Sequence, residues 1–182
     1  MNNNKLMAVV EGLLFLNGDA GVDIEDIKQM LNINEKDEVV KIINNLNHKY
    51  KNDDSCGLMI QTFAQTKFRM VIKNAFFDYY LKLENIKTEA KLSSAAIEVL
   101  SLIAYRGPIS KPEVEQIRGV NCDIHFSKLR QRGLIAENGK AENLVGKPML
   151  YITTDDFLKY FNLNSLDELP PLTAVEENED IF

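Results

Sequence analysis

Apolar and polar positions follow the same order twice along the 182 residues. The first copy runs from about Leu6 to Ile72, and the second from about Ser94 to Thr154. In each copy, apolar residues recur at spacings of three and four through three segments and then alternate through two short ones. This order predicts three helices followed by a two-stranded hairpin in each copy.

In the first copy we expect helices over Leu6–Leu16 and Glu35–Lys51, with a shorter helix between them that Asp23 caps. The shorter helix places four apolar side chains on one face: Ile24, Ile27, Met30 and Leu31. A hairpin follows around the polar turn at 64–67, and a further aromatic helix is expected over Phe76–Leu83.

In the second copy, Ser93 and Ser94 are expected to cap the first helix, and Gly107-Pro108 ends it because proline cannot continue a helix. Ser110, followed three residues later by Glu113, predicts a capping box for the second helix. Val114 and Ile117 of that helix are expected to face inward. The third helix is expected over 121–132, before the second hairpin.

A helix-turn-helix followed by a two-stranded wing is a winged helix. The predicted fold class is therefore mainly α with small β wings (α+β), arranged as two tandem winged-helix domains. We expect an N-terminal domain over 1–84, a linker over 85–92, a C-terminal domain over 93–169 and an acidic, disordered tail over 170–182. Two such domains favour an adaptor or a nucleic-acid binder over an enzyme.

The net charge of -6 counts against DNA binding as the main activity, because contacts with phosphates require a basic surface. Four of the acids lie close together near the end of the sequence: Glu176, Glu177, Glu179 and Asp180. Without them the net charge is -2, so the two domains are nearly neutral and the tail is an acidic extension.

Metal-ligating and catalytic patterns are missing from the sequence. Cys56 and Cys122 have no Cys or His partner at metal-ligand spacing, and His48 and His125 are the only histidines. Glycine-rich phosphate loops and catalytic triads are not recognisable either. We therefore expect a non-enzymatic protein without metal or cofactor. The lack of a signal peptide or a long apolar segment predicts a cytoplasmic protein without membrane association.

The second half carries motifs that resemble a known family. The motifs are Leu92-Ser-Ser-Ala-Ala-Ile-Glu-Val-Leu100, Ile103-Ala-Tyr-Arg-Gly-Pro-Ile109, Glu115-Gln-Ile-Arg-Gly-Val-Asn121, Arg132-Gly-Leu-Ile135, Gly146-Lys-Pro-Met-Leu-Tyr-Ile-Thr-Thr154 and Asn164-Ser-Leu-Asp-Glu-Leu-Pro-Pro-Leu172. They resemble the segregation and condensation protein B (ScpB) family, the accessory subunit of the bacterial SMC–kleisin complex. Lys147, Asn162 and Cys122 depart from the arginine, glycine and serine that the family pattern usually has there.

The resemblance implies a homodimer that binds the central region of the ScpA-like kleisin and, through it, the SMC ATPase, which supplies all of the chemistry. It implies a role in chromosome condensation and segregation at the nucleoid, with DNA contact that is indirect or weak. The alternative is a DNA-binding transcriptional regulator with two winged helices.

Candidate partner-binding residues gather in the second domain. A turn requires Gly and Pro but has no need of the Tyr and Arg at 105 and 106, which are residue types typical of interface anchors. Tyr105 could equally be the last core residue of its helix, and Arg118 could cap helix carbonyls. The full set of candidates is Tyr105, Arg106, Pro108, Arg118, Lys147, Pro148, Tyr151, Pro170 and Pro171.

Two other surfaces are predicted. A first helix that is apolar nearly all round indicates burial on more than one side. We therefore expect a homodimer surface formed by Leu6, Val10, Leu13, Phe76, Phe77 and Tyr80, unless the helix and the aromatic run cover each other. His125, Lys128 and Arg132 share one side of the third helix of the second copy, where the alternatives are a DNA-contacting face and a solvated face.

Overall fold

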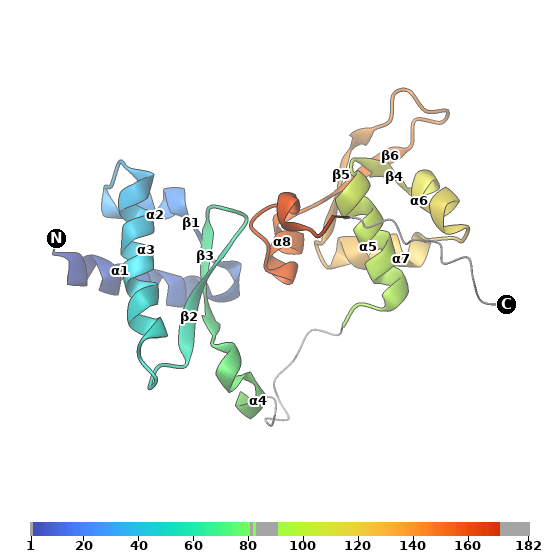
Figure 1. Cartoon of the computed structure of the whole chain (residues 1–182). Helices are drawn as coiled ribbons and strands as arrows, with labels where there is room; N and C mark the ends of the chain where they lie inside the picture. The colour runs from blue at the N-terminus through green and yellow to red at the C-terminus, as the bar shows by residue number, and fades with distance from the viewer. Residues whose placement is uncertain (1, 81, 83–90, 172–182) are drawn as a thin grey trace.

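A computed structural model describes residues 2–80, 82 and 91–171, which form two units on one plan (Figure 1). The N-terminal unit consists of β1 (Val22–Asp23), β2 (Leu58–Phe63), β3 (Lys67–Ile72), α1 (Asn3–Asn17), α2 (Ile24–Leu31) and α3 (Lys36–Lys51). The C-terminal unit consists of β4 (Ile109–Ser110), β5 (Ile135–Lys140), β6 (Met149–Thr153), α5 (Ser94–Arg106), α6 (Lys111–Arg118) and α7 (Asp123–Gln131). This is the predicted mainly helical, tandem winged-helix fold.

Shorter elements complete the chain. Three are single helical turns: η1 (Gly18–Ala20), η2 (Asn74–Phe76) and η3 (Leu166–Glu168). Two are short helices that follow the wings: α4 (Phe77–Tyr80) and α8 (Asp155–Phe161). The helix expected over Phe76–Leu83 is therefore shorter than predicted within the described residues.

Each sheet has a third strand that the sequence pattern did not predict. The strand orders are β1-β3-β2 and β4-β6-β5, with every pair antiparallel. The third strands, β1 and β4, end in Asp23 and Ser110, which are also the N-cap residues of α2 and α6. Because an N-cap residue keeps an extended backbone, here with ψ of 149° and 155°, it can join a strand before its helix begins.

The predicted caps at Asp23, Ser93 and Ser110 are confirmed, whereas Ser94 is the first residue of α5 and not a cap. The Asp23 carboxylate accepts a hydrogen bond from the backbone N–H of Glu25 at 3.0 Å. In the capping box, the Glu113 carboxylate accepts hydrogen bonds from the hydroxyl and the backbone N–H of Ser110, at 2.6 and 2.9 Å. These two bonds, first the one from the hydroxyl, hold the pKa of Glu113 below its usual value.

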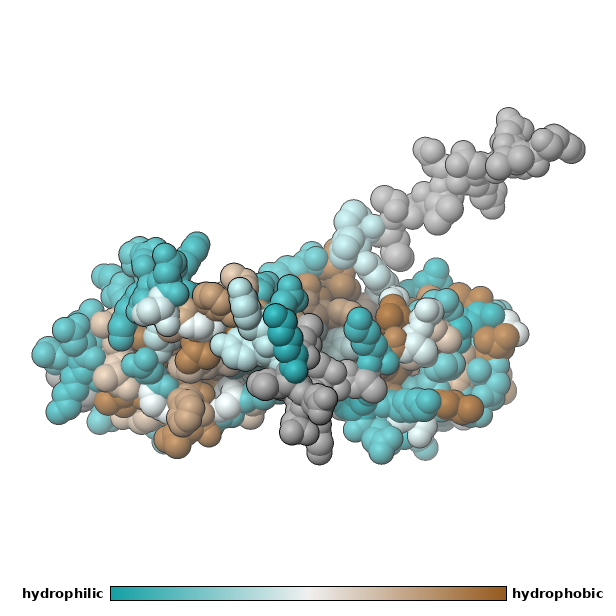
Figure 2. Space-filling view, turned by 90° about the horizontal axis from the view of Figure 1, so that it is seen from below, coloured by the Kyte–Doolittle hydropathy of each residue, from teal (hydrophilic) through white to brown (hydrophobic). Residues whose placement is uncertain are grey.

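Each unit has its own hydrophobic core. The N-terminal core is formed by Val10, Leu14, Val22, Ile24, Ile27, Ile33, Val39, Ile42, Ile43, Leu46, Tyr50, Ile60 and Phe68. The C-terminal core is formed by Val99, Leu100, Ile103, Ala104, Ile109, Val114, Cys122, Phe126, Leu129, Leu134, Ile135 and Phe157. Both cores are small, and apolar surface remains exposed among the polar surface of the two units (Figure 2).

Two side chains from the predicted apolar helix faces are exposed: Met30, and Ile117, which was expected to face inward. Met30 is 42% exposed because it lies about 120° around the helix from Ile24, near the end of the core-facing stripe. Ile117 is 46% exposed, although Val114 on the same eight-residue helix is completely buried. α6 therefore reaches the core through Val114, while Ile117 faces outward beside α5.

The boundaries of the units differ in detail from the sequence-based ones. α7 begins at Asp123 rather than at Asn121, because the Asn121 amide oxygen accepts a hydrogen bond from the Asp123 N–H ahead of the helix. Leu92 packs against the C-terminal core, so it belongs to that unit rather than to the expected linker. The rest of the predicted linker, except Lys91, and residues 172–182 of the predicted tail lie outside the described residues.

A polar joint connects the two units where α8 meets the hairpin of β2 and β3 (Figure 1). The Ala64 N–H donates to the Leu163 carbonyl at 3.2 Å, and Lys67 pairs with Asp155 at 2.7 Å. Arg69 donates to the Lys159 carbonyl at 3.2 Å. The α8 helix therefore belongs to the second unit by sequence and also contacts the wing of the first.

Asp19, in the turn after α1, is the central acid of this joint. Its carboxylate pairs with Arg69 at 2.7 Å and with Lys159 at 3.1 Å. Partial burial acts to raise the pKa of Asp19, but the two cations outweigh it, and the pKa lies below its ordinary value of 3.8. Burial acts to lower the pKa of Lys159, but the hydrogen bonds and charges of Asp19 and Asp156 outweigh it and raise that pKa.

Replacing Arg69 with Ala should loosen the joint, because the substitution removes the pair with Asp19 and the bond to the α8 backbone together. We expect a larger radius of gyration in small-angle X-ray scattering, with unchanged helix content. Lys73→Ala is the matched control, since Lys73 follows the same strand and bonds within the first unit, to the Asp53 carbonyl. A scattering curve of Arg69→Ala that superposes on the wild type would contradict this role.

The lowered pKa of Asp19 sets the sign of a pH effect. Its contribution to the joint is complete above the ordinary pKa of 3.8 and is lost as the pH falls through the lower, folded value. Lys159→Ala should raise the pKa of Asp19 towards its ordinary value in a carboxyl NMR titration. Asp53, whose pKa is lowered by Ser55, is the internal reference and should titrate unchanged.

Candidate partner-binding groove

A groove of about 500 Å³ runs between α5 and α6 on the C-terminal unit. It is lined by Ile97, Glu98, Ser101, Leu102, Tyr105, Arg106, Ile117 and Arg118. Three of these residues, Tyr105, Arg106 and Arg118, are predicted partner-binding residues. The structure thus brings them together on one surface.

The α5 helix has one face buried in the core and one face exposed to solvent. Val99, Leu100 and Ile103 face the core and are at most 1% exposed. Ile97 lies on the other side and is 43% exposed, so it faces Ile117 of α6 across the groove. Two exposed isoleucines on a small domain form an apolar surface of the kind that partners cover.

Arg118 fixes the floor of the groove. Its guanidinium donates to the Glu98 carboxylate at 2.7 Å and to the sulfur of Cys122 at 3.3 Å. The side chain is only 12% exposed. These contacts tie α6 to α5, whereas the sequence left a simple helix cap as an alternative. The bond to the Cys122 sulfur, followed by that to Glu98, raises the pKa of Arg118.

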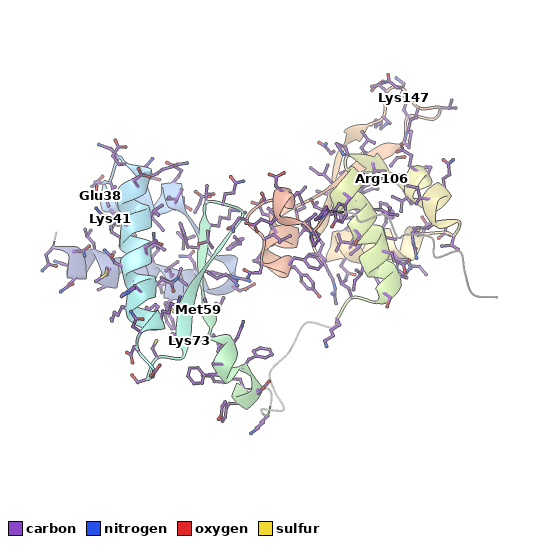
Figure 3. The ribbon with its side chains drawn as sticks, in the orientation of Figure 1. Glu38, Lys41, Met59, Lys73, Arg106 and Lys147 are labelled. Carbon is purple, nitrogen blue, oxygen red and sulfur yellow. The ribbon has the colours of Figure 1, made fainter. Side chains whose placement is uncertain are left out.

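Tyr105 and Arg106 form the end of the groove at the C-terminus of α5. The Tyr105 hydroxyl donates to the Pro170 carbonyl at 2.6 Å, so the segment around Pro170 packs back on this helix. Tyr105 is half-buried and Arg106 is exposed. Figure 3 labels Arg106 on α5 and Lys147 on the second wing.

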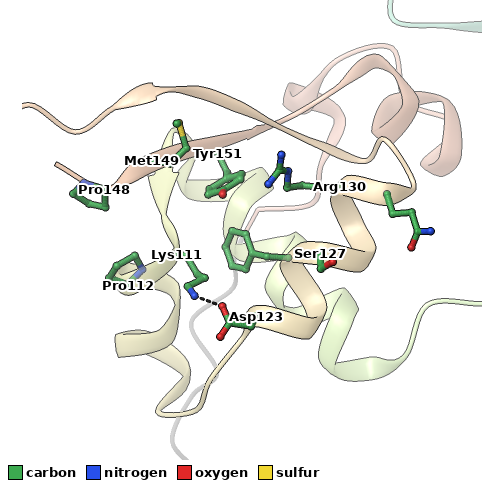
Figure 4. A pocket seen from close by; sticks show the side chains of 10 residues that line it. Lys111, Pro112, Asp123, Ser127, Arg130, Pro148, Met149 and Tyr151 are labelled. Atoms are coloured by element: carbon green, nitrogen blue, oxygen red, sulfur yellow. Dashed lines mark hydrogen bonds and ion pairs between the residues drawn. The ribbon is translucent and has the colours of Figure 1, made fainter. Parts of the chain in front are cut away.

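The remaining predicted partner-binding residues lie elsewhere. Pro148 and Tyr151 line a second groove of about 690 Å³ between α6, α7 and the wing, in which Lys111 pairs with Asp123 (Figure 4). Lys147 lies in the wing loop and pairs with Glu142 at 2.6 Å. Pro108 and Pro171 are exposed outside both grooves.

Comparison with known proteins places the whole chain in one family. The family described as "Segregation and condensation complex subunit ScpB" matches residues 8–172. Segregation and condensation protein B of Bacillus cereus strain AH187 is 41% identical over 181 residues, which cover 100% of this chain and 92% of that protein. The chain belongs to the ScpB family.

A second relative from a Bacillus species supports this assignment. Segregation and condensation protein B of Bacillus mycoides strain KBAB4 is 40% identical over 183 residues, with coverage of 100% of this chain and 92% of that protein. The crystal structure of ScpB from Mycobacterium tuberculosis is 27% identical, covers 88% of this chain and 97% of its own, and has a TM-score of 0.40.

As a member of the ScpB family, the chain is a non-enzymatic subunit of a segregation and condensation complex. No group of three potential metal ligands among His, Cys, Asp and Glu occurs in the described part of the chain. Both cysteines are free thiols, and Cys122 is buried beside Arg118. Within the same residues, no helix is long and apolar enough to span a bilayer.

The residues considered for DNA contact differ in their surroundings in this ScpB-family chain. Lys128 is exposed, His125 is half-buried with an enclosed Nδ1 atom, and Arg132 is half-buried. Arg132 lines a pocket at the joint together with Asp156 and Lys159. The three side chains therefore do not form one exposed basic face.

The residues predicted to form the dimer surface also differ in how far they are exposed to solvent. Val10 is completely buried in the core of its own unit, so it has no surface to offer a partner, which corrects its inclusion. Leu6, Leu13, Phe76 and Tyr80 are half-buried, and Phe77 is 47% exposed.

Sequence reasoning missed Phe15 and Leu16 as surface residues of α1. They are 73% and 81% exposed. Helical geometry could have indicated this exposure. At 100° per residue around the helix axis, Phe15 and Leu16 point away from the face that carries Val10 and Leu14.

Proposed function

We propose that this chain binds the ScpA-like kleisin of the SMC complex through the groove between α5 and α6, and thereby contributes to chromosome condensation and segregation. The groove carries the proposal, because it leaves Ile97 and Ile117 exposed and has Arg106 at its end. We place the chain in the cytoplasm, at the nucleoid. The SMC ATPase would supply all of the chemistry, and this subunit would act by holding the kleisin.

The lining of the groove indicates what kind of segment fits. Ile97, Leu102 and Ile117 provide an apolar strip, whereas Arg106 provides a positive charge. An amphipathic segment that presents apolar side chains on one face would bury this strip. Arg118, already paired with Glu98, keeps the two helices at a fixed spacing before the partner arrives. A preformed groove lowers the entropic cost of binding.

Replacing Ile117 with Asp tests the groove. A carboxylate placed against an apolar partner face loses hydration without gaining a bond, so we expect the Kd for the kleisin to rise at least about tenfold, or about 1.4 kcal/mol. Isothermal titration calorimetry with the ScpA-like protein of the same genome measures it. Val145→Asp is the matched control, since Val145 is fully exposed in the wing loop. Equal affinities of the two variants would contradict the proposed site.

We also propose that two copies of the chain pair through their N-terminal units. Phe15 and Leu16 at the end of α1, together with Phe77 on α4, are large apolar side chains that this chain leaves exposed. The alternative, in which α1 and the aromatic run cover each other, does not account for these exposed fractions. A second copy would bury them, as in other dimers with apolar interfaces.

Introducing Glu at Phe77, or at Phe15, should shift the chain from dimer to monomer, because either change places a charge in the proposed contact. Size-exclusion chromatography with light scattering reports the mass directly. Val40→Glu on α3 is the control, because Val40 is 36% exposed and lies on neither α1 nor α4. A dimer that persists in both Phe variants would refute this surface.

A further inference from the structure

The sequence contains two Asn-Gly pairs, Asn17-Gly18 and Asn138-Gly139, and the structure places them in different surroundings. Such a pair is chemically labile, because glycine has no side chain to shield its backbone nitrogen from the side-chain carbonyl of the preceding asparagine. Attack by that nitrogen closes a five-membered ring. The hydrogen bonds around each pair therefore decide which asparagine is able to react.

The first pair is held by the end of α1. The Asn17 side-chain amide donates to the Leu13 carbonyl at 2.8 Å. The backbone N–H of Gly18 points at the carbonyls of Leu14 and Phe15, as the C-cap of the helix. These bonds must open before the nitrogen can reach the side-chain carbonyl, so the helix end protects Asn17.

The second pair lies in a β-bulge of the second wing. From Glu137 to Lys140, β5 advances three residues while the facing part of β6 advances two. Asn138 and Gly139 fall in this interval, and neither has a partner residue in the register of the two strands. The ladder that fixes the rest of β5 is therefore disrupted at this pair.

The pair in the bulge is also accessible. Asn138 and Gly139 are both exposed, and the Asn138 side chain makes no hydrogen bond to the described part of the chain. Gly139 has a φ of 73°, a conformation that suits glycine. Among the described residues outside its immediate neighbours, no atom lies within 4 Å of the place where a Cβ of Gly139 would be. A new ring at this position thus meets no obstacle.

We propose that Asn138 is a site of spontaneous deamidation in this chain. A base from solvent removes the N–H proton of Gly139, and its nitrogen attacks the side-chain carbonyl carbon of Asn138. The bond from that carbon to the side-chain nitrogen breaks, and ammonia leaves with a proton from solvent. Water then opens the succinimide ring at either carbonyl and leaves aspartate or isoaspartate. The reaction consumes one water molecule and releases one ammonia, and it requires no oxidant or cofactor.

The modification changes the wing in two ways. It adds a negative charge next to Glu137, whose carboxylate pairs with Arg130 at 2.9 Å, and Arg130 lines the second groove. The formal net charge of the chain then goes from -6 to -7. Isoaspartate also inserts a methylene into the backbone of β5, the strand that already holds one residue more than β6 in the bulge. The wing beside the second groove therefore becomes more acidic and less regular as the protein ages.

The test is an ageing experiment on the full-length chain in mildly alkaline buffer. Peptide mass spectrometry with electron-transfer fragmentation measures aspartate and isoaspartate at both Asn-Gly pairs over time. We expect Asn138 to convert at least about tenfold faster than Asn17 in the folded chain, because only Asn17 is held by hydrogen bonds of the helix end. The same incubation in guanidinium chloride is the control for the fold, and there the two rates should become equal.

Asn138→Gln is the matched variant, since its side chain is one methylene longer and cannot close the five-membered ring. Anion-exchange chromatography of the aged wild type should show a growing acidic form, and the variant should lack it. Equal rates at the two pairs of the folded chain, or faster conversion at Asn17, would overturn the proposal. A difference that persists in guanidinium chloride would overturn it as well, because the fold could not then be its cause.

Discussion

Each unit is too small to cover both sides of its first helix, and the surfaces of this protein follow from that constraint. A domain of this size buries a limited fraction of its apolar surface, and it does so around a single core. In the first unit, α1 buries Val10 and Leu14 but leaves Phe15 and Leu16 exposed. In the second, α5 buries Val99 and Leu100 but leaves Ile97 exposed beside Ile117. Both proposed interfaces are the uncovered sides of these helices.

The two units use the same position in the repeat for different purposes. In the first unit, the turn after α1 supplies Asp19, which pairs with Arg69 and Lys159 and so connects the two units. In the second unit, the corresponding end of α5 supplies Tyr105 and Arg106, which border the groove. Duplication of one plan thus yields a connection inside the chain at one copy and an open surface at the other.

Local features of this fold could be predicted from the sequence, because short-range chemistry determines them. The caps at Asp23 and Ser110 and the repeated helical periodicity follow from neighbouring residues alone. The third strands could not be predicted, since a two-residue strand has no pattern of its own and depends on a distant partner. Likewise, the outward position of Ile117 depends on where α5 lies, and the pair between Lys159 and Asp19 joins residues 140 positions apart. For the groove, the residue types at Tyr105 and Arg106 were the useful signal.

The contacts described across the joint are hydrogen bonds and ion pairs, and this has a thermodynamic consequence. Heat capacity changes mainly when apolar surface is exposed, and breaking these polar contacts exposes little of it. The free energy of separating the two units should therefore curve little with temperature, and it should fall as the ionic strength rises, because salt screens exposed charges. Unfolding of the two cores exposes apolar side chains and so carries the large heat-capacity change. Salt thus acts mainly on the connection between the units, whereas the curvature of stability with temperature comes from the cores.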